Sequence, residues 1–217
     1  EVKCSHADGS ATYVCVRVGH CQASLYKNPY QFLVRVFAFL DKMIYPSSKG
    51  DLFMKIRLCT EADIDAVNAI YNHEIENGVA TFDTVTRSKD NAITWFNSHN
   101  TSNHPIFVAV DDNSKVIAYC SLSQYRDKNA FDTTVEISIY VDLSARRQGV
   151  ARALCNHIIA YAKGHSDIHN IVSVITSNNE KSLNLFKSLN FKDGGTIPAV
   201  GIKFGQTLGI TNLYLLV

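Results

Sequence analysis

The sequence predicts an α/β domain whose central sheet is mixed and mostly antiparallel, with helices on both faces. Segments with the period-two alternation of strands recur along the chain, and segments with helical periodicity stand between the later ones. Two early strands, at 106–110 and 116–123, are joined only by the turn-forming run 111–114, which predicts a hairpin. Because strands pair first as neighbours and helices intervene afterwards, we expect a cleft where the strand at 135–141 separates from its neighbour.

The expected elements follow one another without an internal repeat or a low-complexity segment. Residues 55–58 form the first strand, and Thr60 with Asp63 three positions later is typical of a helix N-terminus. The helix that follows has an apolar stripe of Ile64, Val67, Ile70 and Tyr71. The remaining elements are a helix at 88–97, the hairpin strands, a strand at 135–141, a long helix from 149, a strand at 171–175, a helix at 179–188, and strands around 191–200 and 211–217.

The segment 133–154 is the most informative part of the chain. Apolar residues at 135, 137, 139 and 141 alternate with Glu136, Ser138 and Tyr140, so these three side chains share one face of a strand. After a short turn, Gly149 opens a helix whose first-turn N–H groups lack helical partners and point back toward the strand end. Such a helix start binds phosphate. The alternative interpretation is an ordinary strand-loop-helix connection with solvated arginines.

Composition and charge narrow the classes of partner. The chain has 217 residues, of which 46% are hydrophobic, so one domain with a real core is expected together with an extension. A net charge of +1 gives no reason to expect nucleic acid or an anionic membrane, which favours a small substrate. Six cysteines without a C-x-x-C pair, and the lack of a long apolar run or a signal-like start, indicate reduced thiols in a cytoplasmic protein without a bound metal.

Residues 1–53 differ from the rest and are interpreted as an N-terminal extension that lies outside the native enzyme or has no structural role. The chain begins with Glu, three cysteines precede residue 22, and the linker-like run 46–50 ends the segment. We therefore expect the folded domain to span 54–217, beginning at Met54. The apolar patch Phe32 to Tyr45 could instead form an amphipathic helix that docks on the domain or on a partner. Charged residues interrupt this patch, which argues against a membrane span.

Several blocks of the chain resemble a known family. The loop Arg146-x-x-Gly149-x-Ala151 resembles the pyrophosphate loop of the GCN5-related N-acetyltransferase (GNAT) superfamily, in which small residues let the backbone approach phosphate closely. From Lys55 onward the chain is similar to the phosphinothricin N-acetyltransferase branch. The blocks that carry this resemblance, in order, are 70–75, 80–82, 128–136, 140–141, 146–151, 177–182, 185–186, 189–191 and 194–203.

The resemblance implies the GNAT fold and an acetyl-coenzyme A-dependent transfer to the amino group of a small amino-acid-like substrate, of the phosphinothricin or methionine-derivative type. The amine must lose a proton before it attacks the thioester, and Glu136, facing the cleft, is predicted to remove it directly or through water. Matching glutamates have this role in the family. Partial burial would have to raise the pKa of the Glu136 carboxyl. Backbone N–H groups of 139–141 are predicted to stabilise the oxyanion, with no covalent enzyme intermediate.

The family match also assigns binding residues. The predicted coenzyme-binding residues are Ile139, Tyr140, Val141, Arg146, Arg147, Gln148, Gly149, Val150, Ala151, Asn179 and Ser182. The predicted substrate-binding residues are His73, Phe82, Lys128 and Lys203, with Arg126 as a further cation for a substrate carboxylate. For the lysines and Arg126 a solvated surface position is the alternative, for His73 a helix C-terminal turn, and for Asn178 or Asn179 a helix N-cap.

Two departures from the family pattern affect the chemistry. Phe186 stands where much of the superfamily has a tyrosine that protonates the departing thiolate, so Phe186 is predicted to be core and the thiolate to leave unaided. The segment 205–210 lacks the aromatic and charged residues of phosphinothricin enzymes, which leaves the substrate open. A non-catalytic acetyl-coenzyme A sensor and a protein or peptide N-acetyltransferase are the alternative functions. A homodimer is a further expectation.

Overall fold

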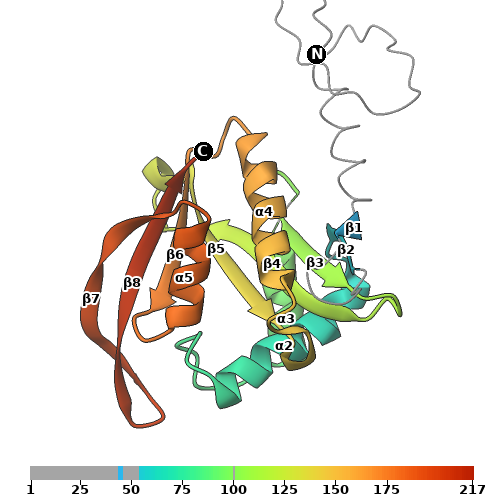
Figure 1. Cartoon of the computed structure of the whole chain (residues 1–217), viewed down its shortest axis with the longest axis horizontal. Helices are drawn as coiled ribbons and strands as arrows, with labels where there is room; N and C mark the ends of the chain where they lie inside the picture. The colour runs from blue at the N-terminus through green and yellow to red at the C-terminus, as the bar shows by residue number, and fades with distance from the viewer. Residues whose placement is uncertain (1–43, 46–53, 100) are drawn as a thin grey trace, which may run out of the picture.

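A computed structural model describes residues 44–45, 54–99 and 101–217 of the chain. Its centre is an eight-stranded sheet in the order β1-β2-β3-β4-β5-β6-β8-β7 (Figure 1). Every neighbouring pair is antiparallel except β5 and β6, which are parallel. The strands are β1 (Ile44–Tyr45), β2 (Met54–Leu58), β3 (Ile106–Val110), β4 (Val116–Gln124), β5 (Thr134–Val141), β6 (Asn170–Thr176), β7 (Lys192–Lys203) and β8 (Gln206–Leu216). The predicted mixed, mostly antiparallel sheet is therefore confirmed.

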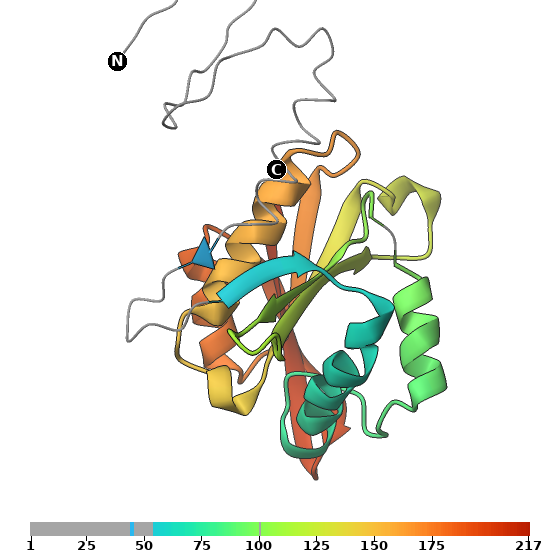
Figure 2. The same ribbon diagram turned by 90° about the vertical axis from the view of Figure 1, so that its right-hand side faces the viewer.

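Helices cover both faces of this sheet, as predicted. The helices are α2 (Ile64–Asn77), α3 (Lys89–Asn97), α4 (Val150–Lys163) and α5 (Glu180–Ser188), with short 3-10 turns η1 (Glu61–Asp63), η2 (Asn129–Phe131) and η3 (Leu143–Ala145). Figure 2 shows α4 on one side of the sheet and α2 with α3 on the other. Leu154 and Ile158 of α4 are fully buried in one core cluster, whereas Val67 of α2 and Trp95 of α3 pack in a second cluster around Tyr119. Each cluster buries the apolar stripe of its helices against one face of the sheet.

The start of α2 is fixed by a carboxylate that joins it to β2. The Asp63 carboxylate accepts hydrogen bonds from the Thr60 N–H and hydroxyl at 2.8 Å each. The Arg57 guanidinium of β2 also donates to it, at 2.6 and 2.8 Å. The bonds from Arg57, and to a smaller extent those from Thr60, together lower the pKa of Asp63 to about 2 in spite of its burial. The Thr60 and Asp63 pair predicted from the sequence is thus confirmed as a helix N-terminus.

The central strands lie where the sequence pattern puts them, but the C-terminal hairpin does not. The strand expected around 191–200 excludes Phe191, begins at Lys192 and runs on to Lys203. The expected start of the last strand at 211 is wrong, because β8 begins at Gln206. A two-residue turn at Phe204 and Gly205, both with positive φ, connects the two strands directly. Backbone pairing with β7, and with β6 at Ile210, holds the segment 206–210 extended, although it contains Gly209, a residue type that is unfavourable in strands.

Part of the N-terminal prediction lies outside the described residues. This applies to 32–43 of the apolar patch and to three of the six cysteines, whereas Ile44 and Tyr45 form β1, which pairs with β2. Cys120 and Cys155 are buried free thiols and Cys59 is a half-buried one. Among the helices of the described ranges, none is both long and apolar enough to cross a membrane.

Candidate active site

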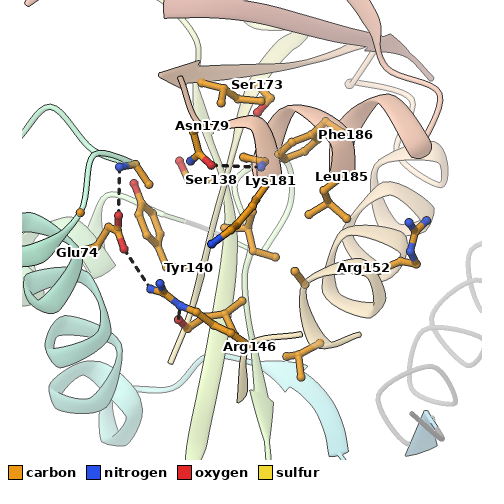
Figure 3. Close-up of a pocket in the computed structure, with 18 of the residues that line it drawn as sticks. Glu74, Ser138, Tyr140, Arg146, Arg152, Ser173, Asn179, Lys181, Leu185 and Phe186 are labelled. Carbon is orange, nitrogen blue, oxygen red and sulfur yellow. Dashed lines mark hydrogen bonds and ion pairs between the residues drawn. The ribbon is translucent and has the colours of Figure 1, made fainter. Parts of the chain in front are cut away.

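A cavity of about 1120 Å³ opens where β5 and β6 separate. The two parallel strands pair only from Thr134↔Asn170 to Glu136↔Val172, and beyond that point 137–141 of β5 and 173–175 of β6 form opposite walls. The loop 78–80, the start of α4 and the start of α5 complete the lining (Figure 3). The cleft expected at this strand is therefore confirmed.

The N-terminus of α4 forms the end of the cavity suited to an anion. Gly149 caps the helix in a left-handed conformation with φ of 83°, and an added Cβ there would meet nothing within 4 Å. The first helical hydrogen bond runs from the Ala153 N–H to the Gly149 carbonyl. The preceding N–H groups, of Val150, Ala151 and Arg152, have no helical partner, and all three residues line the cavity. Free N–H groups and the positive end of the helix dipole favour a phosphate at this position.

The open edge of β5 supplies a second set of backbone groups. Ile139, Tyr140 and Val141 pair with β4 on one side, whereas on the other side β6 has already separated from β5. Backbone N–H and C=O groups along that edge therefore face the cavity, where an extended ligand can bind them. Strand edges with unpaired main-chain groups bind extended partners in the same way.

The structure brings together most residues that were predicted to hold the coenzyme. All of them line the cavity except Gln148, whose side-chain amide donates to the Ser144 carbonyl at 2.7 Å instead. Asn179 caps α5 by accepting the Ser182 N–H at 3.2 Å, so its N-cap interpretation is confirmed, and both residues still line the cavity. Phe186 is 1% exposed and packs on Phe191, which confirms it as a core residue that also forms part of the wall.

Glu136 lies at the rim where β5 and β6 begin to separate. It is the last β5 residue paired with β6, and the cavity wall starts at the next residue, Ile137. Its side chain shares a face with Ser138 and Tyr140, which do line the cavity. Burial raises the pKa of the Glu136 carboxyl, and the Arg126 guanidinium offsets part of this rise. A carboxyl group with a raised pKa is a stronger base than an ordinary one, and a stronger base removes a proton from an ammonium group more readily.

The four residues predicted to bind substrate lie outside the cavity lining: His73, Phe82, Lys128 and Lys203. Lys203 is only 2% exposed, because its ammonium group donates to the Thr81 carbonyl at 2.9 Å and lies 3.5 Å from the Glu74 carbonyl. Burial lowers the pKa of Lys203, while Glu74 and Asp83 raise it. Phe82 packs over Gly201 of β7, and Lys128 is exposed before η2. In the structure Lys203 therefore holds the loop that contains Thr81 and does not line the cavity.

Sequence reasoning missed the acidic residues that line the cavity, Glu74 and Glu180. Glu74 of α2 pairs with Arg146 through an N–O distance of 3.1 Å, and its side chain is only 12% exposed. No local signal marks this contact, because the partners are 72 positions apart in the chain. Lys181 and Ser173 also line the cavity without having been singled out. Among the described residues, no group of three or more His, Cys, Asp or Glu side chains is arranged to hold a metal ion.

A family model described as an acetyltransferase (GNAT) domain matches residues 56–207 of the chain. The protein belongs to the GNAT acetyltransferase family. The match begins within β2 and ends within β8, and so it includes the cavity, Glu136 and the α4 N-terminus.

Similar proteins place the chain in the phosphinothricin-like branch of the GNAT family. It is 35% identical to the L-amino acid N-acyltransferase MnaT of Escherichia coli, over 75% of this chain and 93% of that protein. It is 33% identical to the L-methionine sulfoximine/L-methionine sulfone acetyltransferase of Salmonella typhimurium, over 75% and 94%. The phosphinothricin acetyltransferase of Sinorhizobium meliloti, solved in complex with acetyl-coenzyme A, superposes with a TM-score of 0.73 at 27% identity, over 76% of this chain and 88% of that one.

Proposed function

We propose that this GNAT protein is an acetyl-coenzyme A-dependent N-acetyltransferase that acts on the amino group of a small amino-acid-like substrate. One observation carries the proposal: a single cavity contains the free N–H groups of α4, the open edge of β5 and, at its rim, Glu136. The N–H groups are complementary to phosphate, the strand edge to an extended pantetheine arm, and the carboxylate to an amine. The names of the similar enzymes support an amino acid or its sulfoximine, sulfone or phosphinic analogue as the acceptor.

The residues act in sequence on the amine. The N–H groups of Val150, Ala151 and Arg152 hold the coenzyme pyrophosphate, so that its thioester lies along the open edge of β5. Glu136 takes a proton from the substrate ammonium, directly or through water, and the free amine attacks the thioester carbon. Backbone N–H groups of 139–141 stabilise the oxyanion, and its collapse expels the coenzyme thiolate. Phe186 has no proton to give, so the thiolate leaves unprotonated. The attacking nitrogen loses one of its two remaining protons to solvent and keeps the other as the amide N–H.

Release of free coenzyme A, measured with a panel of acceptors, tests this function. The panel contains L-methionine sulfoximine, L-methionine sulfone, phosphinothricin, ordinary L-amino acids, and peptides with free N-termini or lysines. We expect turnover with members of the amino acid group and none with peptides. Turnover with peptides alone would identify a protein acetyltransferase instead. Tight coenzyme binding without turnover on any acceptor would identify a sensor.

We also propose that 54–217 is the catalytic domain and that it does not require residues 1–53. Both core clusters of the described chain are built from residues at or after Met54, and the family match begins at residue 56. Removal of 1–53 takes away β1, which adds only two paired residues to the edge of β2. We expect the shortened chain to fold and to keep the turnover of the full chain, as measured by circular dichroism and the release assay. Failure to fold would show that the extension packs on the domain.

A homodimer is proposed to form through the face of the β7–β8 hairpin. Four large apolar side chains are exposed on or next to β7: Ile197, Val200, Ile202 and Phe204. A patch of this kind on an edge strand marks an interaction surface. We expect the protein to run as a dimer in size-exclusion chromatography with light scattering, and Ile202→Lys, at a site 71% exposed, to shift it to monomer without loss of secondary structure. A wild-type protein that is monomeric at high concentration would contradict the dimer.

The cellular location is proposed to be the cytoplasm. Cys120 and Cys155 are buried as free thiols, which suits a reducing compartment.

A further inference from the structure

We propose that Glu74 is a positioning residue that couples the coenzyme loop, residues 142–151, to the α2 loop, residues 78–83, whose first three residues line the same cavity. This inference rests on the proposed function, because it requires that the cavity binds the coenzyme. Its basis is one carboxylate that contacts both loops with different oxygens. Oε1 accepts the Ala80 N–H at 3.1 Å, and Oε2 accepts from the Arg146 guanidinium at 3.1 Å (Figure 3).

Arg146 continues this connection into β5. Its Nε donates to the Val141 carbonyl at 3.1 Å, while its terminal nitrogen donates to Glu74. Two edges of the guanidinium therefore bond to protein groups at the end of β5 and on α2. Arg146 acts as a brace between the coenzyme loop and α2 rather than as an arm extended toward solvent. Phosphate contacts then fall to the backbone N–H groups of the α4 start.

The α2 loop is held at its other contacts by groups from the sheet. Lys203 of β7 donates to the Thr81 carbonyl at 2.9 Å, and the Thr176 hydroxyl of β6 donates to the Val79 carbonyl. Gly78 leaves space for the Glu74 carboxylate, because an added Cβ would lie 1.7 Å from Oε1. The loop is thus fixed to β6, β7 and α2, and the Glu74 carboxylate is the contact that extends from it to the coenzyme loop.

The two charges of the pair differ in exposure. The Glu74 side chain is 12% exposed and that of Arg146 is 44% exposed. A carboxylate this buried is costly when unpaired, so Glu74 holds its partners in place. A coenzyme that orders the coenzyme loop restricts Arg146, which restricts Glu74 and with it the Ala80 N–H. Coupling of this kind is reciprocal. If bound coenzyme favours the ordered α2 loop by a given factor, a ligand that orders the α2 loop tightens coenzyme binding by that same factor.

Hydrogen exchange with coenzyme A as the probe tests the coupling without any acceptor amine. In the wild type, saturating coenzyme A should slow amide exchange in 78–83 by about fivefold, at the low end of typical coupling between sites. Glu74→Gln keeps an acceptor for the Ala80 N–H but removes the charge that pairs with Arg146. We expect this variant to bind coenzyme A and to lose the protection of 78–83. Glu76→Gln, an exposed position on the same helix, should behave as the wild type.

Arg146→Gln breaks the same pair from its more exposed end and replaces the first variant if Glu74→Gln does not fold. Protection of 78–83 in both variants equal to that in the wild type would overturn the coupling, as would wild-type binding of coenzyme A without protection of these residues. In either case the proposed function stands. No binding of coenzyme A to the wild type would instead overturn the proposed function and the coupling that rests on it.

Discussion

Gly149→Asp should abolish coenzyme binding. The substituted carboxylate would stand at the helix N-terminus where the pyrophosphate is expected, and two negative charges at one site repel each other strongly. A loss of several kcal/mol of binding free energy corresponds to a Kd that is higher by roughly 10²-fold or more. The backbone strain is modest by comparison, because Asp tolerates the left-handed conformation and an added Cβ at Gly149 meets nothing within 4 Å. The measurement is calorimetric titration with acetyl-coenzyme A.

The matched control for this charge effect is Gly149→Asn. Asparagine has nearly the same shape as aspartate and is tolerated at φ of 83°, but it carries no charge. We expect the Asn variant to retain most of the coenzyme affinity, and Ala151→Glu to lose it as the Asp variant does. If Gly149→Asp bound the coenzyme as tightly as the wild type, the phosphate position at α4 would be wrong.

The fold was predictable where local pattern and tertiary environment agree. In β5, strict alternation separates Val135 and Ile137, which are buried against α4, from Glu136 and Ser138 on the other face. In α4, the apolar residues at 150, 154, 158 and 161 have the spacing of a helical stripe, and the core buries all four. The early part of β8 was missed because Gln206 and Thr207 have no strand pattern of their own. The neighbouring strands determine its conformation through backbone pairing.

The same distinction applies to the candidate site. The α4 start and β5 could be found from sequence because both depend on short-range geometry: a strand, a turn and a capped helix in one segment. Lys203 was expected near the substrate because a lysine in a family block suggests a free cation, yet contacts with Thr81, 122 positions earlier, bury it. Glu74 lies beside Arg146 only through the packing of α2 against β5. Contacts between distant segments leave no periodic pattern in a single sequence. Neither the burial of Lys203 nor the pairing of Glu74 with Arg146 could therefore be predicted from it.

Glu136→Gln should lower turnover by roughly 10² to 10⁴ at neutral pH, the usual contribution of a general base. Glutamine preserves the shape and most hydrogen bonding of the side chain but cannot take the proton, so coenzyme affinity should stay close to that of the wild type. Part of the rate should return at high pH, where more of the amine is already deprotonated in solution. The measurement is kcat/KM against pH for both proteins, in which the acidic limb due to Glu136 should be present only in the wild type.

The pH dependence of thermal stability distinguishes a general-base role of Glu136 from a structural role. Burial raises the pKa of the Glu136 carboxyl, so the folded state favours the protonated side chain more than the unfolded chain does. The stabilisation by the protonated Glu136 side chain is fully present below its pKa in the unfolded chain, about 4.3. This stabilisation is lost as the pH rises through the pKa of Glu136 in the folded protein. At neutral pH the ionised carboxylate therefore costs stability, and Glu136→Gln should raise Tm there relative to the wild type, with a smaller difference at acid pH. A structural glutamate would give the reverse result, a lower Tm with turnover per folded molecule nearly intact. A variant with an unchanged pH–rate profile would show that Glu136 is not the base.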